Sequence, residues 1–163
     1  MSMFNPFGKS FEDITESDLE ILKNLSEGWY VEYKKEKSAK EPAKKIAKSI
    51  TSFANSYGGL FFLGVESDKS TNKAIRFPGV CDFPDLIKDA VRSNAQPFPF
   101  FETHCIKLSN GNQVLMSVVR TGENPPYIHA DGRIYRRQES SPDPIFEDNR
   151  YAIDDLHRKA EQY

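Results

Sequence analysis

Two glutamates and a lysine lie close together in the segment EGWYVEYKKEK, which spans residues 27–37. Glu32 and Lys34 are two residues apart, so a β-strand would direct both side chains to the same face. Such a Glu-x-Lys pair occurs in metal-dependent nucleases, where the lysine positions water or balances charge, and it is also common by chance. The segment is therefore either one edge of a nucleic-acid or metal site, or a surface strand without chemistry.

The spacing of Glu27 and Glu32 limits what these two carboxylates can do together. They are five residues apart, and in a regular strand an odd spacing places side chains on opposite faces. Fully extended, the two positions are separated by about 16 Å. They share a metal ion only if the chain bends between them, and Gly28 is the residue that permits such a bend or bulge. Otherwise Glu27 ends the first helix and Glu32 is a surface glutamate.

Positive charge is concentrated just after this segment. Between Lys34 and Lys48 there are seven lysines and two glutamates, although the whole chain has a formal net charge of −2. Charge of one sign creates a local potential that favours a polyanion, whatever the total charge. The candidate phosphate-binding residues are Lys35, Lys37, Lys44, Lys45 and Lys48, with a second strip at Arg133, Arg136 and Arg137. The alternative is a solvated lysine face without a ligand.

Composition restricts the class of protein. With 163 residues, 38% hydrophobic and 28% charged, the chain fits one globular domain with a real core. It has no apolar run near the length of a membrane span, and its first residues do not read as a signal peptide. The two cysteines, Cys81 and Cys105, form no Cys-x-x-Cys pattern. We therefore expect buried thiols in the reducing cytoplasm.

The elements that position these residues can be predicted from the apolar pattern. A short helix is expected over TESDLEILKNLSE, with Ser17 as a cap candidate, and an aromatic-rich strand over WYVEYKK. The strongest helical pattern is EPAKKIAKSITSFANS, which has Pro42 at its first position and an apolar stripe opposite its lysines. The run from Leu60 to Val65 predicts a strand that is buried on both faces.

The second half predicts another helix, further strands and a final helix. FPDLIKDAVRSNA is amphipathic, and FETHCIKLSNGNQVLMSVVRT contains an Asn110–Gly111 hairpin signal. A shorter hairpin is expected around Asp131–Gly132, and YAIDDLHRKAEQY predicts a C-terminal helix. This alternation of helices and strands predicts an α+β fold, with a mixed β-sheet packed with helices.

Three segments in order carry a resemblance to a known family. These are EGWYVEYK, then SFANSYGGLFFLGVESD, then NPPYIHADGRIYRRQESS. The pattern resembles the Schlafen-type AlbA_2 domain, which implies a single Alba-like domain over residues 27–145. Residues 1–26 would form a helical extension, and residues 146–163 a C-terminal helix. The chain departs from the family pattern at Gly28, where many members have serine, and in the looser RRQESS ending.

The resemblance implies nucleic-acid binding, to RNA or DNA, and not a membrane partner. Animal members of the family resemble metal-dependent endoribonucleases that act on structured RNA such as tRNA. Carried over by motif, the catalytic and metal-binding carboxylates are Glu27, Glu32 and Asp68, with Glu66 competing for the third place and Lys34 beside them. Three carboxylates suit Mg²⁺ or Mn²⁺. The sequence supports no ATP site, because NSYGG is not a phosphate-binding loop.

Two further expectations follow from the resemblance. An Alba-like fold makes a homodimer plausible, because a two-fold axis would extend a binding surface. A third class of function also stays open, namely a non-catalytic protein-interaction or regulatory module in which the lysines only aid solubility.

Overall fold

The computed structural model describes residues 3–138, 141–147 and 150–161. Its helices are the 3₁₀ helices η1 (Phe11–Asp13) and η2 (Glu16–Asn24) and the α-helices α1 (Pro42–Ala54), α2 (Asp85–Asn94) and α3 (Arg150–Glu161). Its strands are β1 (Val31–Lys34), β2 (Gly59–Leu63), β3 (Glu66–Ser67), β4 (Ala74–Arg76), β5 (Ala95–Gln96), β6 (Phe101–Lys107), β7 (Gln113–Val119), β8 (Ile128–His129), β9 (Tyr135–Gln138) and β10 (Ser141–Phe146). The fold is a single α+β domain, as the sequence predicts.

The central sheet has the strand order β1-β2-β7-β6. β1 and β2 are parallel, with Glu32 opposite Phe61, and α1 is the crossover that a parallel pair requires. β7 runs antiparallel to β2, and β6 and β7 form the predicted hairpin around Asn110 and Gly111. The sheet is therefore mixed, and β3–β4, β5–β8 and β9–β10 form small two-stranded sheets beside it.

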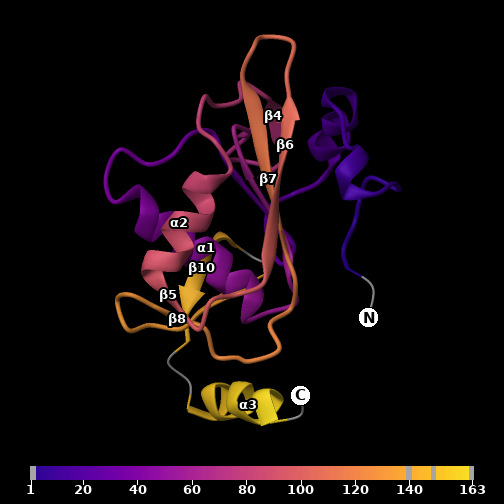
Figure 1. Cartoon of the computed structure of the whole chain (residues 1–163). Coiled ribbons are helices and arrows are strands. Elements are labelled where there is room, and N and C mark those ends of the chain that lie inside the picture. Colours follow the sequence, from indigo (N-terminus) through magenta and orange to yellow (C-terminus); the bar gives the residue numbers. More distant parts are fainter. Residues whose placement is uncertain (1–2, 139–140, 148–149, 162–163) are drawn as a thin grey trace.

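Both faces of the central sheet are covered. Figure 1 shows α1 and α2 on one side of the β6–β7 hairpin and the N-terminal segment on the other side. Leu60 and Phe62 of β2 pack into the cluster on the N-terminal side, whereas Phe61 and Leu63 pack against α1 and α2. This confirms that β2 is buried on both faces.

Helix α1 forms where the sequence predicts it. Pro42 is its first residue, and Ile46, Ile50 and Phe53 face the core. This apolar stripe leaves Lys44 and Lys45 exposed on the opposite side. The helix therefore holds lysines in solvent on a rigid base that is anchored to the sheet.

Two local predictions need correction. The N-terminal helix is a 3₁₀ helix, and its capping residue is Thr15 rather than Ser17. The Thr15 amide donates to Oδ2 of Asp18 at 2.8 Å, and the Asp18 amide donates to the Thr15 carbonyl oxygen at 3.0 Å. Cys81 and Cys105 are exposed, not buried. The predicted hairpin at Asp131–Gly132 is present but short. It is held by the bridge of Ile128 with Ile134 and by the His129 amide, which donates to the Arg133 carbonyl oxygen at 2.9 Å. Within the described residues, no helix is long and apolar enough to cross a membrane.

Candidate nucleic-acid interface

The segment before β1 bends, as Gly28 suggests. Residues 27–30 are bends rather than strand, and β1 begins only at Val31. The Gly28 amide donates to the Val31 carbonyl oxygen at 3.0 Å, which closes the bend. The bend directs the two glutamates to different partners.

Glu32 is fully buried and paired with Arg137. Nη1 of Arg137 lies 2.6 Å from Oε1 of Glu32, and both side chains have no exposed surface. Ser49 of α1 donates from Oγ to Oε2 of Glu32 at 2.5 Å. Both carboxylate oxygens are thus occupied by protein donors, which offsets the large cost of burying a charge.

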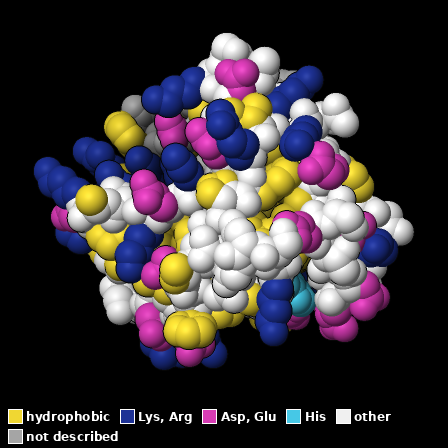
Figure 2. All heavy atoms as spheres, turned by 90° about the horizontal axis from the view of Figure 1, so that it is seen from above, with side chains coloured by type: hydrophobic (Ala, Val, Ile, Leu, Met, Phe, Trp, Pro, Cys, Tyr) yellow, Lys and Arg dark blue, Asp and Glu magenta, His cyan; other side chains and the backbone are white. Residues whose placement is uncertain are grey.

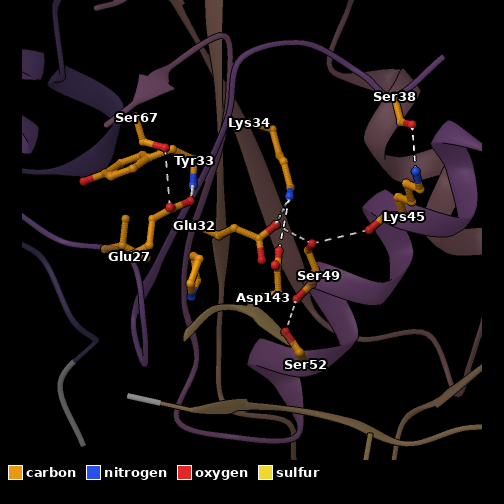
Figure 3. A network of polar contacts seen from close by, with 12 residues as sticks. Glu27, Glu32, Tyr33, Lys34, Ser38, Lys45, Ser49, Ser52, Ser67 and Asp143 are labelled. Carbon is orange, nitrogen blue, oxygen red and sulfur yellow. Dashed lines mark hydrogen bonds and ion pairs between the residues drawn. The ribbon is translucent and has the colours of Figure 1, made fainter. Parts of the chain in front are cut away.

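Lys34 connects this buried pair to the surface. Its Nζ lies 3.9 Å from Oε2 of Glu32 and 3.7 Å from Oδ1 of Asp143, and its side chain is 43% exposed. Glu32 and Lys34 point to the same side of β1, toward Ser49 and away from Glu27 (Figure 3). The shared face predicted for Glu32 and Lys34 is therefore present. The sequence pattern did not single out Ser49 or Asp143 as members of this cluster.

Glu27 is buried on the other side of β1 from Glu32. Its Oε1 accepts the Tyr33 amide hydrogen at 2.7 Å, and Ser67 Oγ lies 3.5 Å from its Oε2 (Figure 3). Burial raises the pKa of the Glu27 carboxyl from 4.5 to about 7, and the charge of Glu32 adds to the rise. The Tyr33 amide opposes it, together with Lys34 and Arg137.

Asp68 and Glu66 each have local partners. Asp68 accepts hydrogen bonds from the amide and the hydroxyl of Ser70, both at 2.8 Å, and these bonds lower the pKa of its carboxyl. Glu66 pairs with Arg76 across β3–β4 at 3.4 Å. Within the described ranges, no group of three or more His, Cys, Asp or Glu side chains could hold a metal ion. As they are arranged, the carboxylates do not fit a shared metal centre.

The lysines form an exposed surface at the start of α1. Lys35, Lys37, Lys44 and Lys45 are exposed, and Lys48 is half-buried. Figure 2 shows Lys and Arg side chains gathered along one side of the face seen from above, with acidic side chains between them. We call the set Lys34, Lys35, Lys37, Lys44, Lys45 and Lys48 the lysine face.

Acidic partners neutralise only part of the lysine face. Lys37 pairs with Asp82 at 3.0 Å, and Lys44 pairs with Glu41 at 3.1 Å. In the part of the chain that the structure describes, no ion pair within 4.0 Å is found for Lys35, Lys45 or Lys48. Positive potential therefore remains at the N-terminal end of α1.

The arginine strip is only partly a surface. Arg133 is exposed and stacks on Phe146 at 4.5 Å, and Arg136 lies 3.5 Å from Glu147. Arg137 is 2% exposed. The prediction that Arg137 contacts phosphate is wrong for this conformation, because its guanidinium is bound inside the protein.

Arg137 instead joins three segments of the fold. Besides Glu32, its guanidinium donates to the carbonyl oxygens of Gly28 at 2.9 Å and Pro142 at 3.0 Å. It also lies over the Phe53 ring at 4.3 Å. The arginine that ends the YRR motif therefore fastens β9 to the bend before β1, to α1 and to β10. Glu139 and Ser140 of the same motif lie outside the described residues.

The FANSYGG motif has a structural role. Nδ2 of Asn55 donates to the carbonyl oxygens of Tyr127 and Tyr135 at 2.9 and 3.0 Å, and its Oδ1 accepts the Tyr127 amide hydrogen at 2.7 Å. Gly58 has φ +75°, and a Cβ there would lie 2.6 Å from the Val119 carbonyl oxygen. The motif thus ends α1, lets β2 approach β7, and ties both to the β8–β9 segment. The side chain of Asn55 therefore binds backbone groups rather than a ligand.

Comparison with known families gives one match. The family model described as Schlafen, AlbA_2 matches residues 27–145, which is most of the chain. No curated protein matches the sequence.

Solved structures also resemble the chain. The crystal structure of the DIP2311 protein from Corynebacterium diphtheriae aligns with a TM-score of 0.53 and 21% identity. The alignment covers 72% of this chain but 25% of that one, so the likeness concerns the fold of one part of a longer protein. The solution structure of the N-terminal domain of a Nitrosomonas europaea protein, named for its relation to the ATP-dependent DNA helicase RecG, aligns with a TM-score of 0.46 and 21% identity. That alignment covers 63% of this chain and 70% of the other, and its TM-score is too low to support an argument.

Proposed function

The chain belongs to the Schlafen AlbA_2 family, and we propose that it binds RNA or DNA through the lysine face. One observation carries the proposal: exposed lysines crowd the loop before α1 and its first turns, and acidic side chains neutralise only some of them. Lysines in such a cluster neutralise phosphates and release counterions, which gives affinity without sequence information.

The packing of α1 supports this assignment. The helix buries Ile50 and Phe53 completely, so the lysines stand on an element that cannot shift easily. Lys48 of α1 lies over the ring of Tyr135, the first residue of β9, at 4.9 Å. Arg133 is exposed in the turn before β9. Phosphates spaced along a strand could therefore be contacted from α1 and from the turn before β9.

Charge reversal tests the proposal. The triple variant Lys44→Glu, Lys45→Glu and Lys48→Glu should weaken binding to unrelated sequences by about 10- to 100-fold at low salt. The slope of log association constant against log salt should also become less steep, by the amount expected for the loss of about two to three phosphate contacts. The matched control reverses Lys69, Lys73 and Lys107, which are exposed in the β3–β4 turn and at the end of β6. Equal loss of affinity in both triple variants, measured by fluorescence anisotropy, would show that only net charge matters and would refute the proposal.

Metal-dependent cleavage of structured RNA is the alternative that the family resemblance raises. It has less support, because Glu32 is buried with both oxygens bound, and Glu27 and Asp68 have other partners. Incubation of tRNA, hairpin RNA and single-stranded DNA with Mn²⁺ or with EDTA tests it. A metal-dependent product that Glu32→Gln abolishes would support cleavage, whereas no product from the wild type would leave binding alone.

A further inference from the structure

A small pocket opens within the lysine face. It has a volume of about 210 Å³ and lies between the end of β1, the loop before α1, the first turns of α1 and β2. Figure 3 shows Lys34 on one side of this region and Ser38 and Lys45 on the other. The pocket is thus part of the surface on which the proposed function rests.

The floor and the rim of the pocket differ in chemistry. Pro42, which is partly exposed, forms the apolar floor together with the buried Ile46, Phe61 and Leu63. Lys34, Lys37 and Lys45 contribute the rim together with the single acid Glu36. A phosphate held by the rim would leave the floor uncovered. A planar ring with a phosphate attached would satisfy both parts, because the ring covers the apolar floor and the phosphate meets the lysines.

Two of the rim lysines are held in place. Nζ of Lys37 lies 3.0 Å from Asp82, and Nζ of Lys45 lies 3.0 Å from Oγ of Ser38. Ser38 in turn donates to the Lys40 carbonyl oxygen at 2.9 Å, which fixes the loop. The rim is therefore preorganised, and less conformational entropy is lost when an anion binds.

The size of the pocket limits its ligand. Pockets for drug-sized ligands span about 300–1,000 Å³, so 210 Å³ suits one ring system rather than a whole dinucleotide. A base inside a duplex is stacked and paired and cannot enter. Only an unpaired or extruded base can reach such a floor.

From these observations we propose that the pocket takes one unpaired base of a nucleic-acid strand, while the lysines hold the phosphates on either side. This assignment rests on the proposed function and sharpens it. The preferred substrate would be a single strand, a bulge or a loop, and not an uninterrupted duplex.

Three RNA duplexes, each made of two separate strands without a loop, test the pocket by fluorescence anisotropy. One has a fully paired stem, one carries a single bulged nucleotide, and one carries the same bulge without its base. Stacking of one base gives the bulged RNA about a tenfold advantage over the abasic RNA. The bulged and the abasic RNA carry the same backbone phosphates, so both should still bind through the lysine face.

Substitutions at the pocket rim distinguish binding of a base in the pocket from binding of phosphates by the lysine face. Ser38→Phe places a ring in the pocket and should reduce the advantage of the base to less than about twofold, whereas its affinity for the paired stem should match that of Ser38→Ala, which also lacks the hydrogen bond to Lys45. Ala39→Phe, on an exposed neighbour that does not line the pocket, should keep the advantage. Ser38→Ala should keep it too, which distinguishes a filled pocket from the lost hydrogen bond to Lys45.

Each of the other possible outcomes contradicts either the pocket assignment or the proposed function. Equal affinity of the wild type for the bulged and abasic RNAs, or a base advantage that persists in Ser38→Phe, would overturn the pocket assignment and leave the lysine face intact. A free nucleoside 5′-monophosphate that bound as tightly as the bulged RNA would overturn the assignment to a strand. Absence of salt-dependent binding to all three RNAs would overturn the proposed function itself.

Discussion

At the scale of single residues, the buried pair of Glu32 and Arg137 gives Arg137 a structural role rather than a phosphate-binding one. Its two charged groups lie 2.6 Å apart with no exposed surface. Removing one partner of such a pair leaves an uncompensated charge in the interior, and that is more costly than removing both.

Replacement of Arg137 tests this role. Arg137→Met should lower the free energy of unfolding by about 3–5 kcal/mol in urea denaturation. The neighbouring Arg136→Met, whose ion pair with Glu147 is longer and partly exposed, should cost less than about 1 kcal/mol. Adding Glu32→Gln to Arg137→Met should recover part of the loss. If the double variant is no more stable than Arg137→Met, lost packing rather than an unpaired charge explains the cost.

Glu27 should make stability depend on pH in an unusual direction. Its carboxyl has a pKa of about 7 in the folded protein against 4.5 as the ordinary value. Between these two values the folded chain holds more protons than the unfolded chain, so stability falls as pH rises. Glu27→Gln keeps an acceptor for the Tyr33 amide without the charge. In EDTA it should be more stable than the wild type at pH 8, by up to about 3 kcal/mol, and equal to it near pH 4.

The wild type is the control for this pH effect, because it shares every other titratable group with Glu27→Gln. The difference between the two curves of unfolding free energy from pH 4 to pH 8 therefore reports on Glu27. A wild-type stability that rises over this range, with Glu27→Gln following the same curve, would contradict the raised pKa of Glu27.

At the scale of elements, the junction between α1 and β2 explains the double glycine. Gly58 combines a left-handed φ with close contact to the backbone of residues 119–121. Gly8 also has a left-handed φ, of +70°, but open space where its Cβ would lie. Comparison of the two positions therefore separates backbone strain from collision.

Alanine at these two glycines gives the prediction. Gly8→Ala should cost about 1 kcal/mol, from strain alone. Gly58→Ala should cost at least about 2 kcal/mol more, since β2 and β7 must move apart to admit the methyl group. Thermal melts of both variants check this, and equal shifts in Tm would mean that the approach of β2 to the end of β7 is looser than the structure has it.

The elements also show how far the sequence alone could reach. The apolar stripe of α1, the doubly buried β2 and the Asn110–Gly111 hairpin are local patterns, and all are present. The burial of Arg137 is not a local property, because its partner Glu32 is 105 residues away along the chain. The contributions of Ser49 and Asp143 have the same origin: each meets Glu32 or Lys34 only through the tertiary fold.

At the scale of the whole molecule, the two sides of the central sheet carry different elements. One side is closed by the N-terminal segment over Leu60 and Phe62, and the other carries α1 with the lysine face. A formal net charge of −2 therefore does not describe the segment from Lys34 to Lys48, which has seven lysines and two glutamates. Steering of a polyanion depends on that local distribution and on ionic strength, not on the total charge.

The most direct test of nucleic-acid binding is the salt dependence of affinity. The dissociation constants of the wild type for a hairpin RNA and for a DNA duplex of unrelated sequence would be measured over a series of salt concentrations. If about three to five lysines contact phosphates, the logarithm of the association constant should fall linearly with the logarithm of salt, with a slope of about −2 to −5 for both ligands. No measurable binding at low salt, or a slope near zero, would contradict a phosphate-binding role for the lysine face.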